Sequence, residues 1–169
     1  NLVKKQLNLH FPDQQEINPK TLKHCFENTI ERIRKCFDPI NLKYYSQGNQ
    51  SYFSHLHGDH YAAFLYFASN EAYLAGDEIL ASKLFLLNKS LFGLDAFYGI
   101  NLPEHFLFIH PLGTILGNAQ YGDYFVVYQG VTIGSTTIGK YPSFSNSTIL
   151  YSNSSIIGDC YIGNNFVLG

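Results

Sequence analysis

The chain has 169 residues, of which 46% are hydrophobic and 14% are charged, and its formal net charge at pH 7 is −2. This balance excludes a disordered chain, an acidic tail and a basic surface for nucleic acid. No run approaches the roughly 18 consecutive apolar residues of a membrane span, and no signal peptide opens the chain, so we expect a cytoplasmic protein. The three cysteines show neither metal-ligand spacing nor an even disulfide framework, which predicts reduced thiols.

Charge and glycine divide the chain near residue 105. Only Asp123, Lys140 and Asp159 are charged after that point, and nine of the 14 glycines lie there. We therefore expect an α-helical N-terminal domain over residues 1–105 and a separate architecture over residues 106–169. The sequence contains no methionine, so we expect that residue 1 is not the natural start.

The first predicted helix has Asn18 as its N-cap, Pro19 as its first residue and Asp38-Pro39 as its end. Its apolar face recurs at spacings of three and four: Leu22, Phe26, Ile30, Ile33 and Phe37. Cys25 and Cys36 lie beside this face, where we expect them to fill the core.

Two further helices are predicted before residue 105. One covers residues 59–75, is rich in alanine and aromatic residues, and ends at Gly76. The other is capped by Asp77, ends at Gly93, and carries a leucine stripe: Leu80, Leu84, Leu87 and Leu91. Neither contains a nucleophile elbow, a phosphate loop or zinc spacing, so their predicted role is packing and assembly.

A six-residue period dominates the last 64 residues. Large apolar residues recur in two runs: Ile109, Ile115, Tyr121, Val127 and Ile133, then Ile138, Phe144, Leu150, Ile156, Ile162 and Leu168. Amphipathic strands and helices have periods of 2 and 3.6, so neither explains this spacing. A hexapeptide repeat does, because each hexad forms one short strand and one turn, three hexads close a triangular coil, and the sixth side chains stack inside.

The repeat carries two further signals. The residue two places before each apolar position is often small, as we expect at a crowded corner: Gly113, Ala119, Thr136, Thr148, Ser154 and Cys160. The step from Ile133 to Ile138 is five instead of six, which predicts a loop that leaves the coil between about Gly134 and Pro142. The repeat stops at Gly169 without a polar cap, so we expect the natural protein to continue beyond it.

This arrangement resembles serine acetyltransferases and their relatives among the hexapeptide-repeat acyltransferases. The resemblance covers roughly residues 60–169 and rests on Phe108-Ile109-His110-Pro111, on residues 128–134 and on residues 156–159, preceded by a helical domain. It implies an α+β protein, with N-terminal helices followed by a left-handed parallel β-helix. It also implies acetyl-CoA as co-substrate, no metal, and a homotrimer or dimer of trimers with active sites between neighbouring coils.

The resemblance also identifies departures. With His110 taken as the family's histidine at the coil entrance, Phe108 stands where the family has an Asp. The family's catalytic Asp-His-Ala/Gly-Thr-Gly segment then has no counterpart, and Tyr141 stands where a second histidine is expected.

His110 is the best candidate for a catalytic base, with Asp123 to orient it. The alternative is that His110 only orders the entrance to the coil. The candidate residues for the acceptor pocket are polar or aromatic: Tyr121, Tyr128, Gln129 and Tyr141. The resemblance places acetyl-CoA contacts near Tyr151, Ser152 and Gly169, although Ser152 also fits a plain corner residue.

His55, His57 and His60 cluster before the second helix. A surface loop, or the rim of a neighbouring active site, is favoured over a metal site because only Asp59 is present to complete a tetrahedral set. We therefore expect no metal here.

The expected function is acetyl-CoA-dependent O-acetyl transfer to a small hydroxyl acceptor, serine or a sugar. Two alternatives stay open: a non-catalytic β-helix scaffold that has lost its base, and a sugar N-acetyltransferase. A zinc β-helix with carbonic-anhydrase chemistry would need three histidines on the coil, and after residue 105 only His110 is present.

Overall fold

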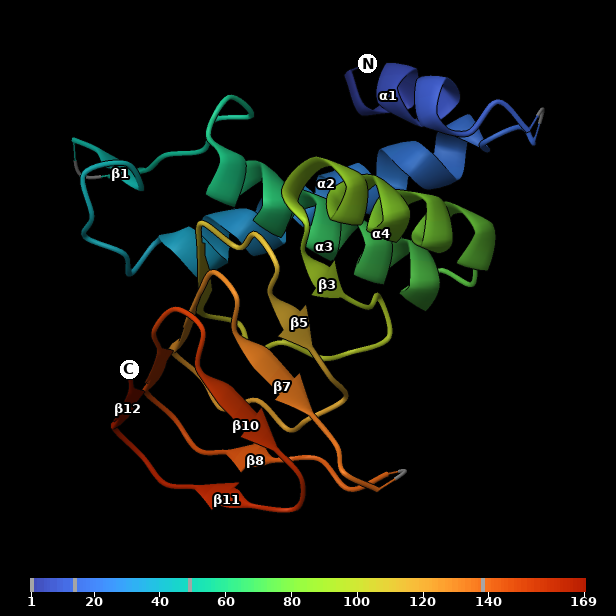
Figure 1. The fold of residues 1–169 in the computed structure, drawn as a ribbon. Helices are drawn as coiled ribbons and strands as arrows, with labels where there is room; N and C mark the ends of the chain where they lie inside the picture. Colours follow the sequence, from blue (N-terminus) through green and yellow to red (C-terminus); the bar gives the residue numbers. More distant parts are fainter. Residues whose placement is uncertain (1, 14, 49, 138) are drawn as a thin grey trace.

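The computed structural model describes residues 2–13, 15–48, 50–137 and 139–169 (Figure 1). Helices come first and a parallel β-solenoid follows, which confirms the predicted α+β architecture. The helices are α1 (Leu2–His10), α2 (Pro19–Phe37), α3 (Gly58–Leu74) and α4 (Glu78–Phe92), and a small hairpin of β1 (Ser46–Gln47) and β2 (Gln50–Ser51) lies between α2 and α3. Within these described ranges, no helix combines the length and hydropathy needed to cross a bilayer.

Helix α2 begins and ends where the sequence predicted. The Asn18 side chain accepts a hydrogen bond from the Lys20 N–H at 2.9 Å, and the helix ends at Phe37. The predicted apolar face is wrong at Ile30, which is 61% exposed. The buried stripe passes through Cys25, Thr29 and Cys36 instead, where the Thr29 hydroxyl donates to the Cys25 carbonyl. The prediction that the two cysteines fill the core is confirmed.

Helix α3 is the central helix of the domain and is buried on almost every side. It packs against α2, α4 and the first long strand of the solenoid, so apolar residues surround it without a clear face. Helix α4 has the predicted caps, with Asp77 accepting from the Leu80 N–H and Gly93 in the left-handed conformation at φ 63°. Leu91, predicted in the buried stripe, is 38% exposed.

The solenoid is built from short parallel strands in three sheets. The first sheet contains β3 (Asp95–Ala96), β5 (Ile115–Leu116), β7 (Thr132–Gly134) and β10 (Ser155–Ile157). The second contains β4 (Phe106–Ile109), β6 (Phe125–Tyr128), β9 (Thr148–Leu150) and β12 (Phe166–Leu168). The third contains β8 (Ser143–Phe144) and β11 (Tyr161–Ile162), and Gln120 extends it by a bridge to Ser143.

The strand registers stack the inward side chains in three columns. These are Phe108, Val127, Leu150 and Leu168; Ala96, Leu116, Ile133 and Ile156; and Tyr121, Phe144 and Ile162. The second predicted run is confirmed from Phe144 onward, while Ile138 lies outside the described residues. The predicted inward residues Ile109 and Ile115 are wrong, because Phe108 and Leu116 fill those places and Ile115 is 46% exposed.

The early turns explain this error. Phe108 pairs with Val127, 19 positions on, and Leu116 pairs with Ile133, 17 positions on, so these turns depart from the 18-residue coil. In the first turns of the solenoid, counting back in steps of six residues therefore selects the residue next to the one that faces inward.

The predicted loop between Gly134 and Pro142 is confirmed. Leu150 pairs with Leu168, 18 positions on, whereas Ile133 pairs with Ile156, 23 positions on. The extra five residues lie between the end of β7 and the start of β8. Lys140 in this loop contacts Asp159 at 3.2 Å.

One corner of the solenoid repeats the same backbone conformation in successive coils. Tyr124, Ser147 and Asn165 all have positive φ, at 59°, 65° and 57°. Beside them, the Asn146 side chain accepts from the Asp123 N–H, and the Asn164 side chain accepts from the Asn146 N–H. The corner therefore carries a ladder of side-chain caps from one coil to the next.

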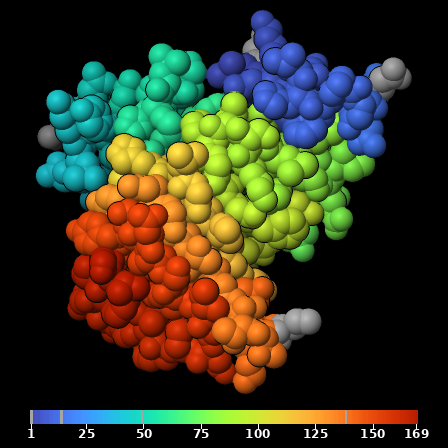
Figure 2. All heavy atoms as spheres, viewed as in Figure 1, coloured from blue at the N-terminus to red at the C-terminus, as the bar shows by residue number. Residues whose placement is uncertain are grey.

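The helices and the solenoid pack directly on one another (Figure 2) and share one hydrophobic core. The Tyr66 hydroxyl of α3 donates to the Ile100 carbonyl and accepts from the Leu102 N–H. Strand β3 already pairs with β5, so the first solenoid strand begins at Asp95. The division into domains at residues 105 and 106 stays a prediction.

A methyl group at Gly122 is expected to destabilise the solenoid. Its Cβ would lie 2.3 Å from the Ser145 carbonyl carbon and 2.8 Å from the Asn146 nitrogen, so the backbone of the next coil would have to shift. Gly122→Ala should lower the free energy of unfolding by roughly 1–3 kcal/mol in urea titrations. Gly163→Ala is the matched control, because nothing lies within 4 Å of its added Cβ; equal stability of the two variants would contradict the prediction.

Candidate functional site

One edge of the solenoid gathers most of the predicted site residues. Strands β4, β6, β9 and β12 run parallel and in register, so their carboxyl ends meet at this edge. Ile109 pairs with Tyr128, and the Tyr151 N–H bonds to the Leu168 carbonyl. Adjacent strands are about 4.8 Å apart, so residues that follow them are close neighbours. The edge carries His110, Tyr128, Gln129, Tyr151, Ser152 and Gly169.

His110 follows β4 directly and is fixed through its backbone. Its φ is 50°, its N–H donates to Asp59 Oδ1 at 3.0 Å, and its carbonyl accepts from the Leu112 N–H at 2.7 Å. The imidazole itself is 77% exposed, and its Nδ1 lies 3.9 Å from Asp59 Oδ1. A rigid backbone thus presents a freely accessible ring with a carboxylate beside it.

Asp59 reaches this edge from the first turn of α3. The residue is only 7% exposed, and its carboxylate lies near the positive end of the helix dipole. Burial raises the pKa of Asp59, and the hydrogen bond from the His110 N–H partly opposes this effect. In the sequence analysis, Asp59 was considered only as a metal ligand. An Asp in the first turn of a helix is usually a cap, and no local pattern connects Asp59 with His110, 51 positions later in the chain.

Asp123 does not orient His110 in this structure. Its Oδ1 accepts from the His105 N–H at 2.9 Å, and its Oδ2 lies 2.8 Å from His105 Nδ1. Burial would raise the pKa of Asp123, but the hydrogen bonds from His105 outweigh it and lower the pKa. His105 and His110 flank the two ends of β4, and five extended residues span about 16 Å, so the carboxylate lies at the opposite end of the strand.

The sequence analysis did not identify His105 as a candidate site residue. Its ring stacks on Tyr124, with centroids 4.9 Å apart and planes at 8°, and it is held by Asp123. No local motif signals this arrangement, because it depends on the register of β4 with β6.

Tyr121 and Tyr141 lie at other parts of the solenoid. The Tyr121 ring stacks on Phe144 inside the coil, and its hydroxyl donates to the Gly117 carbonyl at 2.6 Å. Burial raises the pKa of Tyr121, so this phenol stays neutral. The Tyr141 ring packs on Gly117, where an added Cβ would lie 2.7 Å from it. Neither residue is among those at the His110 edge, and Tyr121 serves the core role that the repeat also predicted.

His57, the N-cap of α3, and His60, in its first turn, belong to an aromatic cluster, so the predicted surface loop is wrong for His60. The His57 and His60 rings stack with centroids 4.2 Å apart, and Tyr45 lies 4.4 Å from His60. His60 is fully buried, its Nδ1 accepts from the Ser54 N–H, and burial lowers its pKa to about 4, so the ring is neutral at pH 7. His55 is exposed. Across the described residues, no three His, Cys, Asp or Glu side chains are arranged to hold a metal ion.

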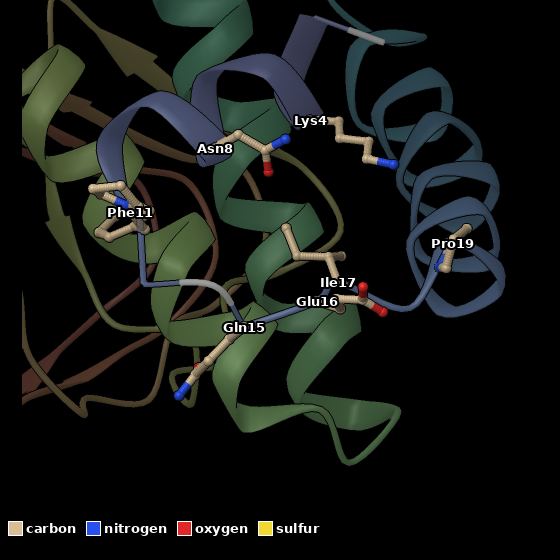
Figure 3. Close-up of a pocket in the computed structure, with 8 residues that line it drawn as sticks. Lys4, Asn8, Phe11, Gln15, Glu16, Ile17 and Pro19 are labelled. Carbon is tan, nitrogen blue, oxygen red and sulfur yellow. The ribbon is translucent and has the colours of Figure 1, made fainter.

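A cavity of 640 Å³ opens beside α1 and the start of α2 (Figure 3). It is lined by Lys4, Asn8, Phe11, Pro12, Gln15, Glu16, Ile17 and Pro19. None of these is a candidate site residue, and none is a histidine, so the cavity offers no base of the kind found at the His110 edge.

The fold and the edge together define a class: a hexapeptide-repeat β-solenoid joined to a helical domain, with an exposed histidine at their junction. No family model matches the chain. Over 87 residues it is 32% identical to the serine acetyltransferase of Synechococcus elongatus. That match covers 49% of this chain and 36% of the Synechococcus enzyme, so only about a third of that enzyme's length is matched.

Solved structures of serine acetyltransferases share the fold. A serine acetyltransferase in complex with CoA superposes with a TM-score of 0.74 at 15% identity, covering 89% of this chain and 65% of that one. The Vibrio cholerae structure gives 0.69 at 15% identity, covering 89% and 61%. Isoform 3 of Entamoeba histolytica, in complex with cysteine, gives 0.62 at 20% identity, covering 88% and 53%. In sequence and in fold, the chain therefore resembles serine acetyltransferases.

Neutralising Asp59 is expected to stabilise the protein. Because burial raises the pKa of Asp59, the folded chain keeps this proton to a higher pH than the unfolded chain does. Its contribution to the free energy of unfolding therefore falls as the pH rises above about 4. Asp59→Asn keeps an acceptor for the His110 N–H, so its Tm at pH 7.5 should exceed that of the wild type, with a smaller difference at pH 4.

The control is Asp159→Asn, which changes an exposed carboxylate. Thermal melts at the two pH values measure the effect. A lower Tm for Asp59→Asn at pH 7.5 would show that the ionised carboxylate is a net stabilising group.

Proposed function

We propose that the chain is the core of an acetyl-CoA-dependent O-acetyltransferase that acts on a small hydroxyl acceptor, with His110 as general base. The observation that carries this proposal is the exposed His110 ring beside the buried Asp59 carboxylate, at the junction of helices and solenoid. The similarity to serine acetyltransferases supports acetyl transfer. In this role Asp59 replaces Asp123 as the carboxylate next to the base.

The chemistry requires few groups. A neutral His110 ring takes the proton of the acceptor hydroxyl while that oxygen attacks the thioester carbonyl carbon. The new ester bond forms, the carbon–sulfur bond breaks, and CoA leaves as its thiol with the proton. We assign acetyl-CoA to the edge that continues from His110 toward Tyr151, Ser152 and Gly169. The acceptor lies next to Tyr128 and Gln129, and Tyr151, whose ring packs on Tyr128, lies between the two ligands.

The position of His110 supports the base role over an ordering role at the coil entrance. Strand β3 precedes it in the solenoid, so His110 lies beyond the entrance. Residues 109–113 can then be compared with the family's Asp-His-Ala/Gly-Thr-Gly segment. They retain its histidine and its final glycine, Gly113, whose φ of 73° favours glycine.

We further propose a homotrimer in which neighbouring coils pack on the outer face of the β4-β6-β9-β12 sheet. Four aliphatic side chains form a row across this face: Leu107, Val126, Ile149 and Val167. A shallow cavity follows part of the row, between Tyr124 and Asn165. Val167 is exposed and the other three are half-buried, and an aliphatic row left open in this way favours burial against another surface. The row runs parallel to the edge that carries His110, two or three residues away along each strand, so the active site would lie in a cleft between copies.

Removal of the proposed base tests the function. His110→Ala should lower the rate of CoA thiol release by about 10²–10⁴-fold and leave acetyl-CoA binding intact. The control is His55→Ala, an exposed histidine outside the edge. Unchanged turnover in His110→Ala would exclude the base role. Acetyl-CoA binding by the wild type without turnover on any hydroxyl acceptor would favour a scaffold instead.

A charge in the aliphatic row tests the assembly. Ile149→Lys should dissociate the trimer, because burying an unpaired ammonium in an apolar interface is costly. Ser143→Lys, on the polar third sheet, should leave the mass measured by light scattering unchanged. A wild-type monomer, or an Ile149→Lys trimer, would exclude this interface.

A further inference from the structure

We infer that the acceptor is a neutral polyhydroxylated molecule of the sugar class and not an amino acid. The inference rests on the proposed function and concerns the same edge of the solenoid. It depends on three properties of the residues around His110: their hydrogen-bonding capacity, their aromatic surface and their charge.

Two side chains at the edge have acceptor capacity to spare. Gln129 follows β6 just as His110 follows β4, and its Oε1 is buried with no hydrogen-bond partner among the described residues. Asp59 Oδ1 accepts from the His110 N–H at 3.0 Å, and a carboxylate has further acceptor sites on its two oxygens. A buried acceptor without a donor is unfavourable, so the edge favours a ligand that donates hydrogen bonds. Neighbouring hydroxyl groups of a sugar supply several donors at once.

Two tyrosines form an aromatic wall beside these acceptors. The Tyr128 and Tyr151 rings pack with centroids 4.9 Å apart and planes at 38°, on strands that end at this edge. Tyr151 is 43% exposed. Aromatic side chains combine a flat apolar face with a polar tip, which suits the C–H face of a pyranose ring and its hydroxyl groups. Serine has no comparable apolar face.

The charge at the edge opposes an amino-acid acceptor. Such an acceptor brings a carboxylate, which requires a cation or several N–H donors. After residue 105 the only Lys or Arg is Lys140, which belongs to the loop before β8 and contacts Asp159. The fixed charge that the structure places beside His110 is the Asp59 carboxylate. It repels an incoming carboxylate and accepts hydrogen bonds from neutral hydroxyl groups.

Ligand-observed saturation-transfer NMR tests the inference on the protein in the presence of CoA. The probes are methyl glycosides of glucose, galactose, mannose and their 2-acetamido counterparts, compared with L-serine and L-homoserine. We expect transfer to at least one glycoside and none to either amino acid. Gln129→Leu should lower the affinity for the glycoside about tenfold, because it removes the free hydrogen-bond acceptor. Gln120→Leu is the matched control, since its amide lies in the third sheet and accepts from Ser143.

The outcomes separate the inference from the proposed function. Saturation transfer to serine, transfer to no glycoside, or glycoside binding that Gln129→Leu leaves unchanged would each overturn the sugar acceptor. CoA thiol release with serine would overturn it as well, while supporting acetyl transfer. Failure of acetyl-CoA itself to bind would instead overturn the proposed function.

Discussion

A solenoid of stacked coils has an apolar core that is open at both ends, and covering the first coil is the constraint on which this structure depends. Helix α3 provides that cover. The Tyr66 ring packs edge-on against Phe106, with centroids 5.6 Å apart, and the Phe67 ring packs on Phe106 at a tilt, with centroids 5.1 Å apart. Phe108 packs on Phe106 in the same cluster. Because β4 carries these phenylalanines and ends at Ile109, directly before His110, the contact that closes the core also fixes the first turn of α3 over the strand end. The position of Asp59 is therefore a consequence of packing.

This geometry gives the helical domain a second role. Its sequence contains no motif of a catalytic site, and its predicted task was packing and assembly. The structure shows that it also supplies the buried carboxylate beside His110. The proposed active site thus belongs to neither part of the chain alone, since the base follows a solenoid strand and its partner begins a helix.

Local signals made much of the fold predictable. Asn18, Asp77 and Gly93 mark helix ends through short-range hydrogen bonds and backbone conformation, and the period of six marks the later coils. The first coils were harder, because Phe108 and Ile109 are adjacent and both apolar, so only the register with β6 decides which one faces inward. At the site, the resemblance to serine acetyltransferases suggested several edge residues, and the strand register places them next to one another. The Asp59–His110 and His105–Asp123 contacts depend on chain segments that meet only in three dimensions, and no pattern in the sequence encodes them.

The ladder of asparagine caps has a consequence for how the solenoid comes apart. Asn146 serves two coils at once, since its side chain accepts from Asp123 and its own N–H donates to Asn164. When one coil unfolds, the preceding coil loses the side chain that caps its backbone N–H group. That preceding coil is then itself less stable. The coils behave as coupled units of a one-dimensional array, in which each boundary between ordered and disordered coils is unfavourable. Such coupling confines fraying to the terminal coil and lets the edge that carries His110 and Gln129 remain ordered as one piece.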